Sequence, residues 1–224
     1  MGKRLVEAQK AIDANKIYTF DEGVVLAKKT ATTKFVGNIE VHVRLGIDPA
    51  KSDQVVRGTV TFTHGTGKVK RVVAFVTPAL EKIAADAGAF LVGGEELIAK
   101  IKQTNVMDFD IAIAQPAMMP KLAGIAKLLG PKGLMPNPKT GTVTDDVAKA
   151  IKEYSTGKVE FKNDQSGNIH LTIGKTNFED VQLATNFKAF MDALNQFKPA
   201  NLKKEYITTI FMHATMGPSI RLKK

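Results

Sequence analysis

Apolar and polar residues alternate strictly over one stretch near the start of the chain. The apolar positions are Ile39, Val41, Val43 and Leu45, and the polar positions between them are Glu40, His42 and Arg44. Successive side chains of a strand point to opposite faces of its sheet, so this period of two predicts a strand with one buried and one polar face. Half-exposed strands of this kind are typical of antiparallel sheets.

Two helices are predicted ahead of this strand. The charged segment 2–14 forms the first of them. Thr19 opens the second, and Glu22 follows three residues later. This is the spacing of a capping box, in which the two residues satisfy free amides at the helix start.

The middle of the chain has a different pattern. Its apolar residues gather in short, nearly continuous runs at 72–76, 89–92 and 111–114. Such runs predict parallel strands that are covered on both faces. Helical stretches separate them, one beginning at Thr77 and Pro78 and ending before Gly88, and another running over 116–129. We therefore predict a doubly wound α/β unit here.

The last third of the chain resembles the first. Thr144 is the expected cap of a helix that begins at Asp145. The alternating stretches 158–162 and 168–173 flank turn-forming residues at 164–167, which predicts a β-hairpin. A long amphipathic helix over 178–197 and a β-branched strand over 205–214 are the remaining expected elements.

These patterns together predict an α/β protein of two domains. A discontinuous α+β domain is built from residues 1–66 and 157–224, and a doubly wound, Rossmann-like α/β domain over 67–156 is inserted into it. The chain crosses between them near Gly65 and Gly67 and again near Gly157. These glycines are candidate hinges that absorb backbone rotation, and tight turns explain them equally well.

Composition favours a polyanionic partner. Lys and Arg number 32 against 22 Asp and Glu, a formal charge of +10, and the basic residues are spread along the whole chain. This favours nucleic acid over a membrane, while a basic surface that only aids solubility is the alternative. The chain has no cysteine, which excludes thiol chemistry and fits a reducing cytoplasm. No apolar run approaches the ~20 residues of a membrane span, so we expect a soluble protein without a signal peptide.

Nucleotide-binding motifs do not fit the chain. The glycine-rich stretch 64–68 places Phe62 where a phosphate loop needs glycine and Val69 where it needs Ser or Thr. It also precedes a predicted strand, and not the helix whose amides would hold phosphate. No dinucleotide fingerprint follows a strand of the middle domain. We therefore expect no nucleotide cofactor.

Catalytic and metal-binding constellations are also weak. Glu95 and Glu96 are neighbours on a helix and point apart, and Asp145 and Asp146 suit a helix start. Asp108 and Asp110 lie on one side of an extended segment and could hold a metal, but no partner ligands are nearby, so they are interpreted as solvated loop charges. His42, His64, His170 and His213 are isolated in the sequence, so a metal cluster needs long-range convergence. The sequence therefore predicts no enzyme, no metal and no cofactor.

One loop carries the most information. Its prolines and glycines over 130–143 exclude a helix or a central strand and demand a defined conformation. Lys132 and Lys139 are expected to be exposed on it. The loop is thus a candidate for phosphate binding or domain docking, and a plain structural connector is the alternative.

With this loop, the segments 57–59, 65–68 and 215–219 resemble the signature segments of the ribosomal protein L1 family, bacterial type. The resemblance covers essentially the whole chain. It implies a two-domain fold with an inserted α/β domain, and a split domain that binds large-subunit rRNA to build a mobile stalk beside the tRNA exit site. It also implies a role in release of deacylated tRNA, repression of the protein's own mRNA, and a cytoplasmic, ribosome-bound protein that is a monomer when free.

The resemblance also implies RNA-contacting residues. These are Lys34, Phe35, Asn38, Glu40, Thr215, Met216, Gly217, Pro218 and Ser219. His42 shares the polar face with Glu40, so an RNA contact and an ordinary solvated histidine are both open. This chain departs from the family in having Asn38 for the usual threonine and Phe62 and Thr63 for the usual Leu-Pro pair. The lost proline bears on the stiffness of the first crossing.

Two other functions compete with this interpretation. One is a nucleotide-dependent enzyme built on the middle domain, which bound nucleotide or turnover would reveal. The other is a general single-strand binder, which the 7% aromatic content and the absence of tryptophan disfavour.

Overall fold

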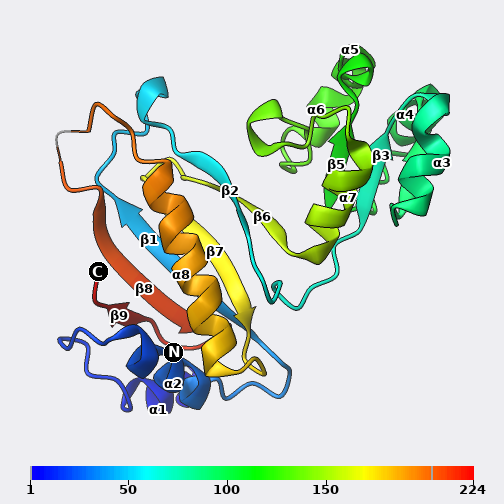
Figure 1. Cartoon of the computed structure of the whole chain (residues 1–224). Coiled ribbons are helices and arrows are strands. Elements are labelled where there is room, and N and C mark those ends of the chain that lie inside the picture. The colour runs from blue at the N-terminus through cyan, green and yellow to red at the C-terminus, as the bar shows by residue number, and fades with distance from the viewer. Residues whose placement is uncertain (1, 203) are drawn as a thin grey trace. The chain divides into compact units, whose positions relative to one another are not determined.

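The computed structural model describes residues 2–202 and 204–224 of the chain. It divides into two compact units, one made of residues 1–67 with 159–224 and the other of residues 68–158 (Figure 1). The helices of the first unit are α1 (Lys3–Gln9), α2 (Phe20–Thr30) and α8 (Asp180–Gln196), with a short 3₁₀ turn η1 (Ser52–Gln54). Its strands are β1 (Asn38–Leu45), β2 (Arg57–Thr61), β6 (Lys158–Lys162), β7 (Asn168–Lys175), β8 (Ile207–Ala214) and β9 (Ile220–Leu222).

Both ends of the chain build one antiparallel sheet in the first unit. Its strand order is β7-β1-β8-β9 among the described residues. The central strand β1 pairs His42 with His170 of β7 on one side and with Phe211 of β8 on the other. The alternation predicted over 39–45 is present, because every second residue of β1 from Ile39 is buried. The predicted α/β class with an antiparallel sheet from both chain ends is confirmed.

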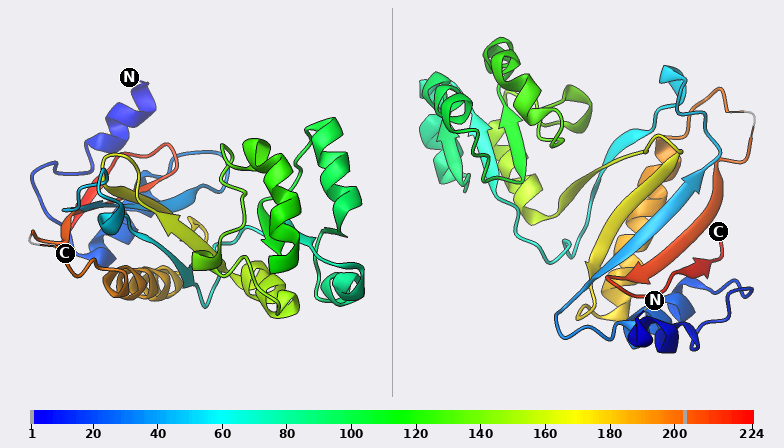
Figure 2. Two further views of the ribbon diagram at one scale, coloured as in Figure 1. Left: turned by 90° about the horizontal axis from the view of Figure 1, so that it is seen from above. Right: turned by 180° about the vertical axis from the view of Figure 1, so that it is seen from behind.

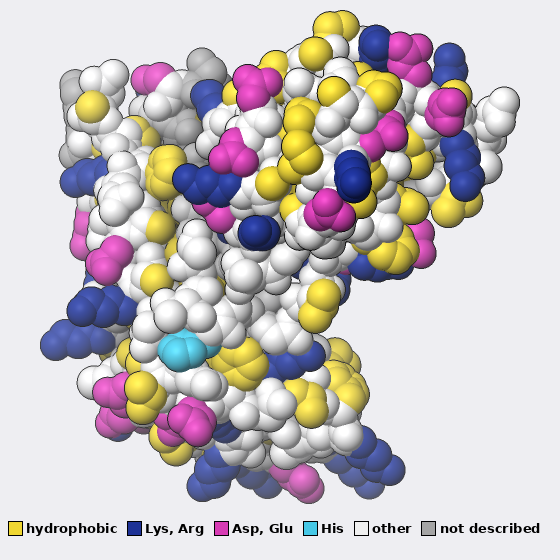
Figure 3. Space-filling view, turned by 45° about the vertical axis from the view of Figure 1, so that its right-hand side comes forward, with side chains coloured by type: hydrophobic (Ala, Val, Ile, Leu, Met, Phe, Trp, Pro, Cys, Tyr) yellow, Lys and Arg dark blue, Asp and Glu magenta, His cyan; other side chains and the backbone are white. Residues whose placement is uncertain are grey.

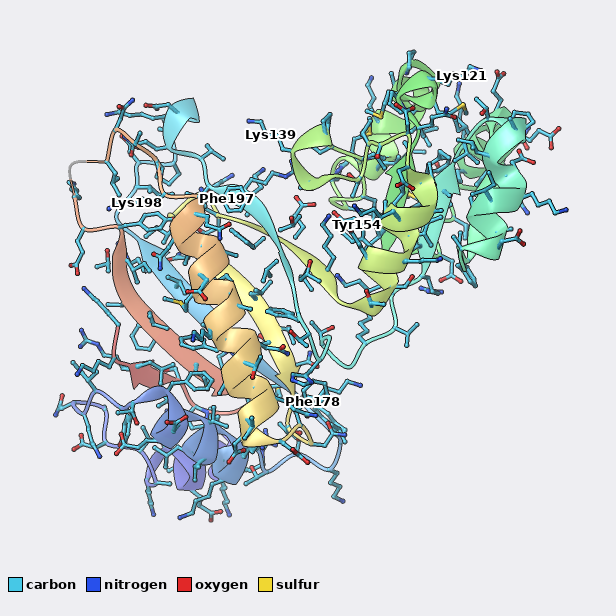
Figure 4. The ribbon with its side chains drawn as sticks, in the orientation of Figure 1. Lys121, Lys139, Tyr154, Phe178, Phe197 and Lys198 are labelled. Carbon is cyan, nitrogen blue, oxygen red and sulfur yellow. The ribbon has the colours of Figure 1, made fainter. Side chains whose placement is uncertain are left out.

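Helices α8 and α2 cover one face of this sheet and enclose the core. The core includes Val24, Ala27, Ile39, Val41, Val43, Ile169, Leu171, Ile173, Leu183, Phe190, Leu194, Ile210 and Met212. Phe178 and Phe197 stand at the two ends of α8 (Figure 4). The predicted capping box of α2 is confirmed, since Thr19 Oγ1 accepts from Glu22 N–H and Glu22 Oε2 accepts from Thr19 N–H at 2.9 Å. Phe62, just before the first crossing, is buried in this core.

A polar side chain on α8 ties the helix to the first crossing. Asn186 is fully buried, and its Nδ2 donates to Ile173 O at 2.8 Å and to Gly65 O at 2.9 Å. Gly65, Gly67 and Gly157 all have positive φ, a conformation that other residues adopt only with strain. The Asn186 bond therefore anchors Gly65 to the first unit.

Replacing this asparagine is expected to destabilise the protein. Asn186→Ala removes both hydrogen bonds, leaves the carbonyls of Ile173 and Gly65 without this donor, and opens a cavity under α8. We expect a loss of about 2–3 kcal/mol in the free energy of unfolding. Urea unfolding followed by circular dichroism measures it, with the exposed Thr185→Ala on the same helix as control. Equal stability of the two variants would contradict this account.

The second unit is a parallel sheet with helices on both faces. Its strands are β3 (Val72–Phe75), β4 (Leu91–Gly93) and β5 (Ile111–Ala114), in the order β4-β3-β5. Its longer helices are α3 (Pro78–Asp86), α4 (Glu95–Thr104) and α7 (Val147–Thr156), and its short helices are η2 (Pro116–Met118), α5 (Met119–Leu122), η3 (Ala123–Ile125), α6 (Ala126–Leu129) and η4 (Pro138–Thr140). One face of the sheet packs on α4 and α5 and the other on α3 and α7. The doubly wound arrangement is confirmed.

Three local predictions were wrong. The stretches 158–162 and 168–173 are strands joined by a turn, but they do not form a hairpin, because β6 pairs with β2 while β7 joins the larger sheet. Asn163 fixes this, since its Oδ1 accepts from Val56 N–H at 2.8 Å and its own N–H donates to Val56 O. Asp146, and not Thr144, caps α7 by accepting from Lys149 N–H. The helix expected over 116–129 is broken into short pieces, since Pro120 lacks an amide and Gly124 weakens helix formation.

Candidate nucleic-acid interface

Figure 2 (right) shows the face of the large sheet that α8 does not cover. The strands place mostly polar residues on this face. By alternation and strand register it carries Asn38, Glu40, His42 and Arg44 from β1, Asn168, His170 and Thr172 from β7, Thr209, Phe211 and His213 from β8, and Arg221 from β9. The set combines hydrogen-bond donors, acceptors, cations and imidazole rings. We call this surface the open face.

Two segments that are far apart in the sequence meet at one end of the open face. Asn38 N–H donates to Thr215 Oγ1 at 3.0 Å, and Thr215 N–H donates to Asn38 O at 2.9 Å. Gly37 permits this close approach. Any other residue would place its Cβ only 3.3 Å from the Cβ of Thr215, which is tighter than ordinary van der Waals contact. The structure therefore brings the two halves of the predicted RNA-contacting set together.

Large apolar side chains are exposed where these segments meet. Phe35 is 58% exposed and Met216 is 66% exposed. Val36 between Phe35 and Gly37 is exposed as well. Apolar side chains beside a polar sheet face offer surfaces on which the flat faces of bases or riboses can stack. This part of the site matches a single-stranded or looped RNA better than a regular duplex.

The backbone around Met216 is held in an unusual conformation. Met216 has a φ of 64°, in the left-handed region that disfavours side chains with a Cβ. Gly217 N–H donates to Ala214 O at 2.7 Å, which closes the turn. Arg4 Nη2 donates to Met216 O at 3.4 Å from α1. The turn thus presents Met216 and Ser219 to solvent, while Pro218 is buried and offers no exposed side chain.

Histidines converge on the open face. His42 Nδ1 lies 2.7 Å from His170 Nδ1, and the rings of His42 and His213 stack with centroids 4.7 Å apart. His213 Nε2 is 3.9 Å from Glu40 Oε2. Burial, reinforced by the neighbouring His213 and His170, lowers the pKa of His42 to about 4, so this ring is neutral at pH 7. These histidines are isolated in the sequence, and the long-range convergence that a cluster requires occurs for three of the four, because strand pairing joins residues that the sequence separates.

Comparison with known proteins is consistent with this geometry. The model of the family described as "Ribosomal protein L1p/L10e family" matches residues 27–218, which is most of the chain. The chain belongs to the ribosomal protein L1 family. A protein of Mycoplasma capricolum subsp. capricolum named large ribosomal subunit protein uL1 is 51% identical over 223 residues, covering 100% of this chain and 98% of that protein. The uL1 protein of Mesoplasma florum is 48% identical over the same coverage.

Family membership confirms two expectations from the sequence. The resemblance to the L1 family was correct, and as a ribosomal protein the chain is a structural protein and not an enzyme. Among the described residues, no helix combines the length and the apolar character that crossing a membrane requires.

The loop over 130–143 of this L1-family chain has the defined conformation predicted for it. Asn137 organises it, with Oδ1 accepting from Lys139 N–H at 2.8 Å and its N–H donating to Thr142 Oγ1 at 2.7 Å. Tyr154 of α7 donates to Thr140 O at 2.5 Å. Lys132 and Lys139 are exposed on the loop, and Figure 4 shows Lys139 and Tyr154. Lys34 of the first unit is exposed as well.

Asp108 and Asp110 of the second unit both have basic partners. Asp110 is not a freely solvated loop charge as predicted, because it accepts from Arg71 N–H at 3.0 Å and pairs with Lys68 Nζ at 3.1 Å. The Arg71 amide, with help from Lys68, holds the pKa of Asp110 below its usual value. Asp108 pairs with Arg71. On the face shown in Figure 3, other Lys and Arg side chains lie at separate places among acidic and apolar ones.

Sequence reasoning missed several residues of the open face. His170, His213, Phe211 and Arg221 were not assigned to the site, and Arg4 was not expected beside Met216. Alternation in 168–173 placed His170 on one face of its strand, and the β-branched composition of 205–214 indicated the strand that holds Phe211 and His213. Neither pattern carried a signal for which strands are neighbours, so the cluster could not be assembled from the sequence.

Proposed function

We propose that this chain is a structural protein of the large ribosomal subunit that binds large-subunit rRNA through its first unit. The contact surface is the open face together with the turn over 215–219. The observation that carries the proposal is the pair of exposed apolar side chains, Phe35 and Met216, at the junction of two segments in a chain of the L1 family. The uL1 relatives are likewise named as proteins of the large ribosomal subunit.

The site residues divide by the part of the RNA that they suit. Phe35 and Met216 offer apolar faces to bases or riboses, and Asn38 and Glu40 suit 2′-hydroxyl groups, which distinguish RNA from DNA. Lys34 is exposed and supplies charge for a phosphate. The remaining members proposed from the family resemblance are Thr215, Gly217, Pro218 and Ser219. His42 is proposed because it shares the polar face of β1 with Glu40. Because Pro218 is buried and Gly217 is tied to Ala214, these two act by shaping the turn.

We further propose the finer roles that the L1 family resemblance implies. These are formation of a mobile stalk near the tRNA exit site, assistance in the release of deacylated tRNA, and repression of the protein's own mRNA through an RNA fold similar to the rRNA site. Gly65, Gly67 and Gly157 are the candidate hinge, and Lys132 and Lys139 a secondary basic loop. Sequencing the RNA that copurifies with the chain from cells tests rRNA, tRNA and mRNA together.

Substitutions of Met216 separate its binding role from its structural role. Met216→Gly removes the side chain and relieves the left-handed backbone, so we expect about 0.5–1 kcal/mol of added folding stability. Loss of the RNA contact is expected to cost about 1–3 kcal/mol of binding to an rRNA fragment. Thermal unfolding and filter binding measure the two effects, and Met216→Ala is expected to weaken binding without the gain in stability.

Val181→Ala is the matched control, because Val181 is an apolar side chain that is 73% exposed on α8, away from the open face. It should leave RNA binding unchanged. If Met216→Gly stabilises the fold and binds the fragment as tightly as the original chain, the turn is not part of the RNA site. Length-dependent binding that ignores RNA sequence would favour a general single-strand binder.

A further inference from the structure

Side chains of the kinds that bind transition metals meet on the open face. Glu40, His42 and His213 each offer one donor atom, and these atoms all lie within 4.8 Å of one another. Glu40 and His213 are directly paired across β1 and β8, and His42 follows Glu40 on the same face of β1. The sheet backbone therefore sets the spacing of this group, with no flexible loop involved.

The hydrogen bonding of His213 leaves the correct nitrogen free. His213 Nδ1 lies 2.9 Å from Ala214 O, and a carbonyl oxygen only accepts, so Nδ1 carries the proton. In the neutral ring Nε2 then has a free lone pair, and this is the atom that lies 3.9 Å from Glu40 Oε2. Metal-bound histidines usually donate their second nitrogen to a carbonyl or carboxylate in this way, which fixes the ring for the ion.

His42 is oriented by a second imidazole. Its Nδ1 lies 2.7 Å from Nδ1 of His170. The Asp164 carboxylate beside His170 Nε2 can only accept, so in the neutral His170 ring Nε2 carries the proton and Nδ1 accepts from His42 Nδ1–H. Nε2 of His42 then keeps a free lone pair for an ion. His170 Nε2 in turn lies 3.4 Å from Asp164 Oδ2. The chain of contacts from Asp164 through His170 to His42 resembles the outer support of a metal site, in which carboxylates and hydrogen bonds position the ligands.

We propose that Glu40, His42 and His213 form a binding site for Zn²⁺ on the open face. Two imidazole nitrogens and one carboxylate oxygen suit zinc, which takes such ligands at ~2.0–2.2 Å, whereas Mg²⁺ and Ca²⁺ prefer oxygen alone. Ligands of a tetrahedral zinc site lie roughly 3.4 Å apart at these bond lengths. The observed 3.9 Å between His213 Nε2 and Glu40 Oε2 is close to this spacing, and one of the stacked rings of His42 and His213 must rotate for both Nε2 atoms to point at the same ion. Water completes the fourth position.

This site goes beyond the proposed RNA-binding function, although Glu40 and His42 take part in both. The test uses the full chain without an affinity tag, stripped of metal with a chelator and free of RNA. Its failure is therefore distinct from a failure of RNA binding. Co²⁺ serves as a spectroscopic probe, because its visible absorption reports tetrahedral coordination, and Zn²⁺ displaces it in a competition titration.

We expect one equivalent of Co²⁺ to bind with a tetrahedral spectrum and one equivalent of Zn²⁺ to displace it. Glu40→Gln, His42→Ala and His213→Ala should each weaken Zn²⁺ binding at least tenfold. His64→Ala is the control, because His64 is exposed outside the open face, and it should bind as the original chain does. His170→Asn should cause a smaller loss, since His170 acts by positioning His42.

Several results would overturn the proposal. These are no saturable binding at millimolar Zn²⁺, an octahedral Co²⁺ spectrum, or a Zn²⁺ affinity that Glu40→Gln and His213→Ala leave unchanged. Circular dichroism and thermal unfolding identify variants that fail to fold. Glu40→Gln keeps the shape of the side chain, so the proposal remains testable if His42→Ala does not fold. Equal losses in His64→Ala and His213→Ala would show nonspecific binding to histidine and also count against the site.

Discussion

Raising the salt concentration from about 50 mM to about 200 mM is expected to weaken binding of an rRNA fragment by about a thousandfold or more. Each phosphate that a Lys or Arg neutralises releases condensed counterions, and added salt opposes this release. With a formal charge of +10 and basic side chains on both units, the chain has ample charge to make the ~6 phosphate contacts that such a loss requires. Filter-binding titrations at several salt concentrations give the slope of log affinity against log salt concentration.

The salt slope also locates the contacts. Lys34→Ala should lower the magnitude of the slope by about one, because one phosphate contact is lost. Lys82→Ala on α3, in the second unit, is the matched control if the first unit binds the RNA. Neutral solutes such as sucrose at equal osmolarity should leave affinity almost unchanged. A flat salt response would mean that the basic surface is not the RNA-binding surface.

Removing the second unit is expected to leave specific rRNA binding in place. Residues 68–158 have cores of their own, formed between the parallel sheet and its helices, while the core of the first unit draws on strands and helices from both chain ends. Deleting residues 68–156 and joining the flanks with a short flexible linker should therefore give a protein that folds. The isolated segment 68–158 should also fold and should lose specific binding entirely.

Binding is compared between the rRNA fragment and a scrambled RNA of equal length and composition. Any affinity that the trimmed protein loses, through the absence of Lys132 or Lys139, should be salt-sensitive and indifferent to RNA sequence. Specific binding by the isolated segment would move the site to the second unit. A trimmed protein that folds and ignores the fragment would also contradict the assignment to the first unit.

The sequence predicted where strands and helices lie more reliably than it predicted which strands pair with one another. Alternation around Val41 revealed a strand and its buried face, and the continuous run over 72–76 revealed a strand covered on both sides, because these patterns depend only on local geometry. The predicted hairpin failed for the same reason, since period two does not say which strand lies beside another. Strand β9 (Ile220–Leu222) is too short to give a pattern and was not predicted.

In the candidate site too, local sequence patterns identified some features and could not identify those that depend on the fold. By residue type alone Met216 is typical of a filler in a hydrophobic core, and only the family resemblance placed it in a binding site. In the structure it is 66% exposed on a left-handed turn, a conformation that no local pattern in the sequence indicates. The meeting of His42 with His170 and His213 depends on the register of strands from distant parts of the chain.

The pairing of β1 with β8 has a consequence for synthesis on the ribosome. The hydrogen bond from Asn38 N–H to Thr215 Oγ1 joins residues 177 positions apart. At ~5–20 residues per second the ribosome needs roughly 10–35 s to reach Thr215 after Asn38, so β8, one of the two strands that pair with β1, is made long after β1 itself. The strands of the second unit are all made within that interval. We therefore expect the inserted unit to fold first on the nascent chain, while the apolar side of β1 depends on chaperones for protection.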